Sequence, residues 1–283
     1  MISRYWIFKS AFAATVTLLA LSIAHAQPAK KEAAAALKEY TPHVGQSGKD
    51  VVWVPTALTL VNKLLDMAKL TPQDILYDLG SGDGRTVITA AKRGARAYGI
   101  EFNPDMVELS KRNAVKEGVA DKATFERADI FKSDFSKATV VTLFLLPSLN
   151  VKLRPTLLNM KAGTRVAANS FDMGDWKPDQ TERVEGDCES WCTAYLWIVP
   201  AKAEGTWKTA NGELILKQDY QFINGTLRTG DKTLAISNGK LEGERIAFSV
   251  GVAQYSGRVN GDNMEGVTTT GEVKAPWNAT RGK

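Results

Sequence analysis

The pattern of apolar and polar residues divides the chain into two parts. From residue 51 to about residue 200, short segments that predict strands, at residues 75–78, 97–101 and 123–130, alternate with segments whose apolar positions repeat with the helical period. These helices are expected at residues 58–67, 86–93, 106–116 and 149–160. The alternating order predicts an α/β sheet with helices on both faces.

The end of this first part has its own pattern. Residues 138–146 are continuously apolar, which is expected of a strand buried on both faces of a parallel sheet. Residues 163–170 predict another strand, and residues 181–187 with 192–199 predict a closing hairpin. Thr56 is expected to cap the first helix, and Asn103 with Pro104 marks the start of the third.

The pattern changes near residues 200–204. Beyond Gly205 there is no helical period, and short β-prone runs alternate with turns of the Asn-Gly, Gly-Asp and Gly-Glu types. Residues 239–246 and 257–264 repeat one another, each predicting strand, tight turn and strand. Residues 51–200 are therefore expected to form one domain. Residues 205–283 are expected to form a second, all-β domain of seven or eight antiparallel strands, as a small barrel or a sandwich.

The first 26 residues predict an export signal. Arg4 and Lys9 precede an apolar stretch at residues 11–23, which is too short for a comfortable membrane span. Residues 24–26 read Ala-His-Ala, which fits a signal-peptidase site. We expect cleavage after Ala26, a flexible tether over residues 27–50, a periplasmic mature chain and no stable membrane span. An uncleaved membrane anchor is the alternative.

Charge and composition argue against a nucleic-acid partner and against a metal. The formal charge of +5 falls to +3 when Arg4 and Lys9 are removed, and the basic residues form no stripe interleaved with aromatic residues. Two cysteines and two histidines far from them do not make a zinc site. In an exported chain, Cys188 and Cys192 would form either a disulfide across the predicted hairpin or two free thiols.

Residues 78–85 join a predicted strand to a predicted helix through the pattern D-x-G-x-G-x-G. The glycines allow the backbone to approach a ligand closely, and the helix start offers free N–H groups. The spacing differs from the dinucleotide fingerprint G-x-G-x-x-G. A tight turn without a ligand is the alternative for this motif taken alone.

Three successive predicted strands end in a carboxylate, namely Asp78, Glu101 and Asp129. Glu101 lies about 20 residues beyond the glycine turn, where an acidic residue can accept hydrogen bonds from ribose hydroxyls. A carboxylate at Asp129 can accept from an adenine amino group. The regular recurrence favours one ligand site over three unrelated solvated charges.

The glycine turn resembles motif I of the class I S-adenosylmethionine-dependent methyltransferases. More broadly, residues 51–200 resemble a bacterial and archaeal group related to the mitochondrial lysine methyltransferases of the adenine nucleotide translocase and the ATP synthase c-subunit. Histone lysine methyltransferases of the Dot1 type are a more distant likeness. The resemblance is carried by residues 54–56, 78–85, 99–101 and 171–176. The β-domain and the export signal lie outside it.

The resemblance implies a Rossmann-like sheet and S-adenosyl-L-methionine as the cofactor, with residues 54–56 closing over it. The residues expected to bind the cofactor are Thr56, Asp78, Gly80, Ser81, Gly82, Gly84, Glu101 and Asp129.

The methyl acceptor is expected at the end of the fourth strand, residues 144–147. This segment reads Phe-Leu-Leu-Pro and lacks the side-chain amide or carboxylate that would hold an exocyclic amine, which disfavours a nucleobase acceptor. An apolar slot suits an aliphatic amine that enters uncharged. Candidate residues for catalytic contacts are Leu146, Pro147, Asn169 and Ser170. The alternative is that residues 144–147 are only core.

We therefore expect a methyltransferase that acts on a protein lysine amine. Two other functions stay open at this point. One is an exported binding module that has the cofactor fold but no turnover, and the other is a methyltransferase for a small molecule such as an amine. The sequence does not predict an oligomeric state.

Overall fold

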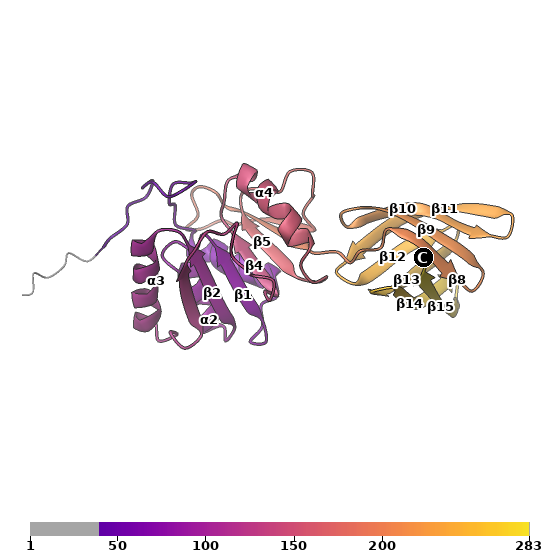
Figure 1. The fold of residues 1–283 in the computed structure, drawn as a ribbon, viewed down its shortest axis with the longest axis horizontal. Coiled ribbons are helices and arrows are strands. Elements are labelled where there is room, and N and C mark those ends of the chain that lie inside the picture. Colours follow the sequence, from indigo (N-terminus) through magenta and orange to yellow (C-terminus); the bar gives the residue numbers. More distant parts are fainter. Residues whose placement is uncertain (1–39, 283) are drawn as a thin grey trace, which may run out of the picture. The chain divides into compact units, whose positions relative to one another are not determined.

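The computed structural model describes residues 40–282 (Figure 1). The predicted signal peptide and most of the predicted tether lie outside the described residues. Within residues 40–282 there is no helix both long enough and apolar enough to cross a bilayer.

The first part of the chain folds as a seven-stranded sheet in the order β3-β2-β1-β4-β5-β7-β6 (Figure 1). Strands β1 to β5 are parallel, while β7 runs antiparallel to both β5 and β6. The strands are β1 Ile75–Leu79, β2 Arg96–Glu101, β3 Ala123–Arg127, β4 Val140–Leu143, β5 Arg165–Asn169, β6 Gln180–Arg183 and β7 Thr193–Ile198. The predicted α/β sheet and its closing hairpin are confirmed.

Helices cover both faces of this sheet, as the pattern predicts. They are α1 Leu58–Met67, α2 Arg85–Lys92, α3 Pro104–Lys116 and α4 Pro147–Leu158. The first three share one core with Leu76 and Ala97 of the sheet, and α4 packs through Leu153 and Leu157 into a second core. All four residues of β4 are buried, which explains the continuous apolar run around them.

Several local expectations are corrected. Thr56 does not cap α1, because the capping position is Ala57 and no side chain bonds there. Thr56 instead binds other elements: its hydroxyl accepts from the Asn169 amide at 3.3 Å, and its carbonyl accepts from Arg85 at 2.9 Å. Strand β3 ends at Arg127, so Asp129 lies in the following loop. Helix α4 starts at Pro147, because proline suits the first helical position.

The second part is a closed antiparallel barrel in the order β10-β11-β12-β13-β14-β15-β8-β9. This closure decides between the barrel and the sandwich. The strands are β8 Gly205–Thr209, β9 Gly212–Asp219, β10 Phe222–Thr229, β11 Lys232–Glu242, β12 Arg245–Val250, β13 Ala253–Asn260, β14 Asn263–Thr270 and β15 Val273–Arg281. The repeated segments form hairpins whose turns use Gly243 and Gly261 at φ 61° and 58°. Positive φ explains why glycine stands in both turns.

Residues 171–176, one of the stretches that carry the family resemblance, have a structural role at their end. Trp176 is fully buried, and its indole N–H donates to Gln221 beside the barrel strand β10 at 3.1 Å. The Gln221 amide also donates to the Lys177 carbonyl at 2.8 Å, and Trp197 donates to the Trp176 carbonyl at 2.8 Å. This stretch therefore links sheet and barrel through satisfied hydrogen bonds.

Candidate active site

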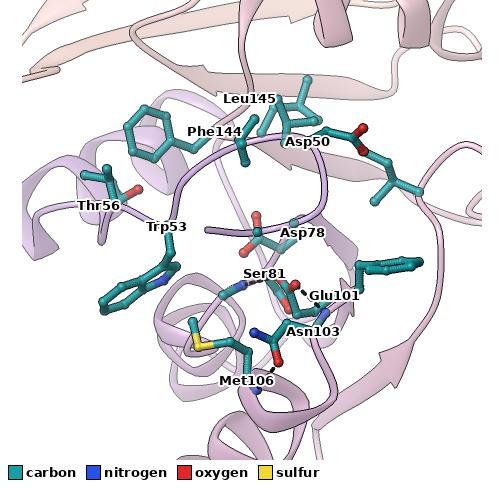
Figure 2. Close-up of a pocket in the computed structure, with 18 of the residues that line it drawn as sticks. Asp50, Trp53, Thr56, Asp78, Ser81, Glu101, Asn103, Met106, Phe144 and Leu145 are labelled. Atoms are coloured by element: carbon teal, nitrogen blue, oxygen red, sulfur yellow. Dashed lines mark hydrogen bonds between the residues drawn. The ribbon is translucent and has the colours of Figure 1, made fainter. Parts of the chain in front are cut away.

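A cavity of about 580 Å³ lies at the carboxyl ends of the parallel strands, where the strand order reverses between β1 and β4. Open α/β sheets bind ligands at such switch points, and the volume is typical of a small-molecule site. Figure 2 shows labelled side chains from β1, the glycine turn, the end of β2, the segment after β4 and residues 50–56 around one central space. The three predicted carboxylates all line this cavity.

The glycine turn forms the floor of the cavity. Gly80 and Gly82 adopt φ values of 84° and 53°. A Cβ atom on Gly82 would lie 2.7 Å from the indole nitrogen of Trp53, and one on Gly80 would lie 3.2 Å from the Leu145 side chain. The chain thus needs glycine here both for backbone angle and for space.

Gly84 serves a different purpose from the other two glycines. It is not among the residues that line the cavity. It stands at the start of α2 with φ 83°, and a Cβ atom there would lie 2.8 Å from the Phe125 ring. Its role in the structure is close packing of helix and sheet, while its predicted contact with the cofactor stays a prediction.

Ser81 offers a buried polar atom to the cavity. The residue is 5% exposed, and among the described residues its hydroxyl has no hydrogen-bond partner. Gly99 on β2 makes room for it, because a Cβ atom there would lie 2.5 Å from the Ser81 oxygen. Leaving a buried hydroxyl unpaired is unfavourable, so a polar ligand atom at this point would stabilise the site.

The carboxylates differ in their surroundings. Asp78 is buried and accepts a hydrogen bond from the Thr142 hydroxyl at 2.7 Å. Burial raises its pKa to about 7, and the nearby Glu101 carboxylate acts in the same direction. Glu101 accepts from the backbone N–H groups of Gly82 at 3.0 Å and Asn103 at 2.8 Å, so it fixes the glycine turn to the start of α3.

Asp129 is held by a residue that the sequence reasoning missed. Its carboxylate forms an ion pair with Lys49 at 2.9 Å, and this hydrogen-bonded cation keeps the pKa of Asp129 below its usual range. Lys49 belongs to residues 46–56, all of which line the cavity, including the predicted residues 54–56. The side chain of Trp53 lies against the glycine turn from this same segment (Figure 2).

Of the four residues predicted to make catalytic contacts, the structure places one in the cavity lining. Leu146 lines the cavity, whereas Pro147, Asn169 and Ser170 are not among its lining residues. Asn169 binds Thr56 as described, and the Ser170 hydroxyl accepts from the Thr193 backbone at 3.2 Å. Their predicted catalytic contacts stay predictions, and only Leu146 is positioned to touch a ligand in this cavity.

Three aromatic side chains border the cavity beside Leu146. Phe144 packs against Phe171 with ring centroids 5.9 Å apart and against Trp191 at 6.3 Å. Phe171 and Trp191 were not among the predicted site residues. Phe171 is the first residue of the stretch 171–176, and Trp191 lies between Cys188 and Cys192, which are joined by a disulfide in the structure.

Comparison with known proteins agrees with this geometry. Residues 78–180 match the family described as the ANTKMT methyltransferase domain. A protein-lysine N-methyltransferase of Saccharolobus islandicus is 39% identical over 163 residues, which are 56% of this chain and 96% of that protein. The chain belongs to this methyltransferase family. The human lysine N-methyltransferase of the ATP synthase c-subunit is 36% identical over 128 residues, or 45% of this chain and 54% of that protein. The chain thus spans only about half the length of this animal relative.

A solved structure extends the comparison to a bound ligand. The RNA methyltransferase of Salinibacter ruber, crystallised with S-adenosyl-L-homocysteine, is 49% identical. The match has a TM-score of 0.50 and covers 53% of this chain and 95% of that one. Our chain is an S-adenosylmethionine-dependent methyltransferase, and its cavity suits that cofactor: glycines leave space beneath it, Ser81 offers an unpaired hydroxyl, and carboxylates face it.

Proposed function

We propose that the protein transfers a methyl group from S-adenosylmethionine to the ε-amine of a lysine in another protein. The observation that carries this proposal is the apolar character of the acceptor end. Phe144, Leu146, Phe171 and Trp191 border the cavity there, and residues 144–147 contribute no side-chain amide or carboxylate. The names of the archaeal and animal relatives support a lysine acceptor.

This environment suits the chemistry of an alkyl amine. S-adenosylmethionine supplies an electrophilic methyl group on a sulfonium centre. An amine can accept it only with a free lone pair, and apolar walls lower the pKa of a lysine ammonium by desolvating its charge. The side chains of Phe144 and Leu146 would also exclude water and align the amine with the methyl carbon.

RNA is the principal competing acceptor, because the Salinibacter relative is named an RNA methyltransferase. A nucleobase amine is planar and needs polar partners at its edge, which the Phe-Leu-Leu-Pro segment does not supply. The scattered basic residues also give little support for an RNA surface. A small-molecule amine would fit the same walls, and so it is a further outcome of the test.

The test uses the chain from residue 27 onward, S-adenosylmethionine labelled in its methyl group, and cell extract from the source organism. We expect label in material that proteinase destroys and ribonuclease does not, with methyl-lysine released by acid hydrolysis. Gly80→Arg, which fills the cofactor floor, is the inactive control. Label that ribonuclease removes would show that RNA, and not a lysine, is the methyl acceptor. Label found only in low-mass material would favour a small-molecule acceptor. No label in any fraction would favour the binding module.

We also propose that the enzyme works outside the cytoplasm. Residues 1–26 have the features of a cleavable signal peptide, and a disulfide between Cys188 and Cys192 is stable in an oxidising compartment. Intact mass of protein isolated from the source cells should correspond to a chain that starts at Gln27 with two fewer hydrogens than its dithiol form. A chain that starts at Met1, recovered from the cytoplasmic fraction, would contradict this proposal.

A further inference from the structure

Trp191 combines features that a purely structural residue does not need. It is 48% exposed although it is the largest kind of apolar side chain, and it lines the acceptor end of the cavity. Its φ is 55°, in the left-handed region that a bulky residue rarely adopts. Strained backbone of this kind concentrates at ligand-binding sites.

The disulfide explains how this conformation is kept. Cys188 and Cys192 close a loop that contains only three residues, so Trp191 lies directly beside a cross-link. Cys192 is buried immediately before β7, and its carbonyl accepts a hydrogen bond from the Val184 backbone N–H at 2.8 Å. Immediately before Cys188, at the other end of the loop, the Asp187 carboxylate accepts a hydrogen bond from the Thr59 hydroxyl on α1. The loop is therefore attached at both ends to ordered elements.

The surroundings of Trp191 favour a cation. Its ring meets Phe144 in an edge-to-face arrangement, and Phe144 in turn stacks on Phe171. Aromatic faces attract ammonium ions, especially methylated ones. The closed loop carries the exposed acid Glu189, two residues before Trp191, which adds a negative potential to this segment.

We propose that Trp191 is a specificity residue at the exposed side of the cavity: it recognises the alkylammonium group of the acceptor before the amine loses its proton against Phe144 and Leu146, and it recognises the ammonium group of the methylated product. Its position depends on the Cys188–Cys192 disulfide. This proposal rests on the proposed lysine function and deepens it. Trp191 would contact the acceptor, whereas the two cysteines act only as positioning residues. Acceptor recognition should then depend on the redox state of the disulfide, while cofactor binding should not.

The experiment uses binding without turnover, so that it is independent of the transfer assay. The probes are a short peptide with trimethyl-lysine and its uncharged analogue, in which a tert-butyl group replaces the trimethylammonium group. Both are titrated by ligand-observed NMR against the oxidised chain saturated with S-adenosylhomocysteine. A cation–π contact predicts that the charged peptide binds about two- to fivefold tighter than its isostere. Equal affinities would overturn the proposal, even if lysine methylation were demonstrated.

Variants of Trp191 test whether this residue causes the tighter binding of the charged peptide. Trp191→Ala should abolish it and Trp191→Phe should keep most of it, with the same melting temperature and cofactor affinity as the wild type. Phe222→Ala is the matched control, because Phe222 is an equally exposed aromatic residue, at 48%, on the barrel. A preference that survives Trp191→Ala would overturn the assignment.

The role of the disulfide is tested in the same assay. Reduction by a water-soluble phosphine, which yields two thiols and the phosphine oxide with oxygen from water, should remove the preference. The double variant Cys188→Ala/Cys192→Ala should behave in the same way without reductant. Cofactor affinity should stay within about twofold in both, since neither cysteine lines the cavity. A reduced or cysteine-free protein that keeps the full preference would show that the disulfide does not position Trp191.

Discussion

The sheet and the barrel bury their apolar residues in different ways, and the cavity described above follows from the way the sheet does so. The parallel strands end together at one edge, and a crevice opens there because the strand order reverses between β1 and β4. The barrel closes on itself, and its inward positions fill a core that includes Trp207, Leu241 and Met264. The position of the cavity is therefore determined by the parallel direction and the order of the strands.

The same difference appears in how the two regions use glycine. In the sheet part, Gly80 and Gly82 hold space open beside the cavity. In the barrel, Gly261 has the same kind of positive φ, but a Cβ atom there would meet nothing within 4 Å. A barrel glycine of this kind is required only by the turn, whereas Gly80 and Gly82 are required both by the turn and by the close approach of neighbouring side chains.

The largest expected effect comes from filling the glycine floor. Gly80→Arg should abolish cofactor binding, because a long side chain would start 3.2 Å from Leu145 and occupy the cavity. Isothermal titration with S-adenosylhomocysteine measures this. Gly261→Arg is the matched control, since it changes a barrel glycine of similar φ. Cofactor binding by Gly80→Arg at wild-type affinity would remove the site from this cavity.

The next effect is the pH dependence of stability that Asp78 introduces. Its pKa is raised from 3.8 to about 7 in the folded protein, mainly by burial. The stability linked to this group is therefore fully present below about pH 4 and is lost as pH rises through 7. A difference of one pKa unit corresponds to about 1.4 kcal/mol, so ionisation of the buried Asp78 carboxyl lowers the free energy of unfolding by up to about 4 kcal/mol.

An asparagine at position 78 cannot ionise, so the Asp78→Asn variant separates the contribution of this carboxyl to stability from those of all other titratable groups. Asp78→Asn should become more stable relative to the cofactor-free wild type as the pH rises from 5 to 8, as measured by urea unfolding. Asp231→Asn, an exposed exchange in a barrel turn, should show no such trend. A constant difference between Asp78→Asn and wild type across this range would mean that Asp78 is not buried as described.

Removing the carboxylate of Glu101 should weaken cofactor binding without abolishing it. Charge-assisted hydrogen bonds contribute about 1.5–3 kcal/mol, which corresponds to about 10- to 150-fold in the dissociation constant. Glu101→Ala would also free the N–H groups of Gly82 and Asn103 that the carboxylate now holds. Glu101→Gln separates the two contributions, since its amide oxygen can accept one of these bonds. An unchanged dissociation constant in Glu101→Ala would contradict the predicted ribose contact.

The smallest of these effects concerns the link between the two regions. Gln221→Ala leaves the buried Trp176 indole and the Lys177 carbonyl without their partner, which should cost about 1–3 kcal/mol of unfolding free energy. Gln254→Ala, at an exposed barrel position, should change stability by less than about 0.5 kcal/mol. Equal effects of the two substitutions would show that the Trp176 contact contributes nothing. Whether residues 205–283 fold alone stays a prediction, to be tested by expressing that segment.

Much of the fold and the cofactor floor can be predicted from the sequence, because both rest on short-range patterns. Alternating helical and strand periods indicate a parallel sheet, and in such a sheet the ends of successive strands meet at one edge. Asp78, Glu101, Gly80 and Gly82 therefore lie together for reasons visible along the chain. The two repeated hairpins, with Gly243 and Gly261 in their turns, can be predicted for the same reason, because each is formed by residues that are neighbours in the sequence.

The tertiary structure alone decides contacts between segments that no period relates. Ser170 has the right residue type and sequence position for an acceptor contact, yet its hydroxyl is bound to the Thr193 backbone, while Trp191 reaches the cavity from the hairpin. Thr56 binds Asn169, which is 113 residues away, in place of capping its own helix. The sequence by itself determined the elements, their order along the chain and the residues at the strand ends. Packing between distant segments determined which side chains border the cavity, because a side chain's environment depends on all the elements that meet there.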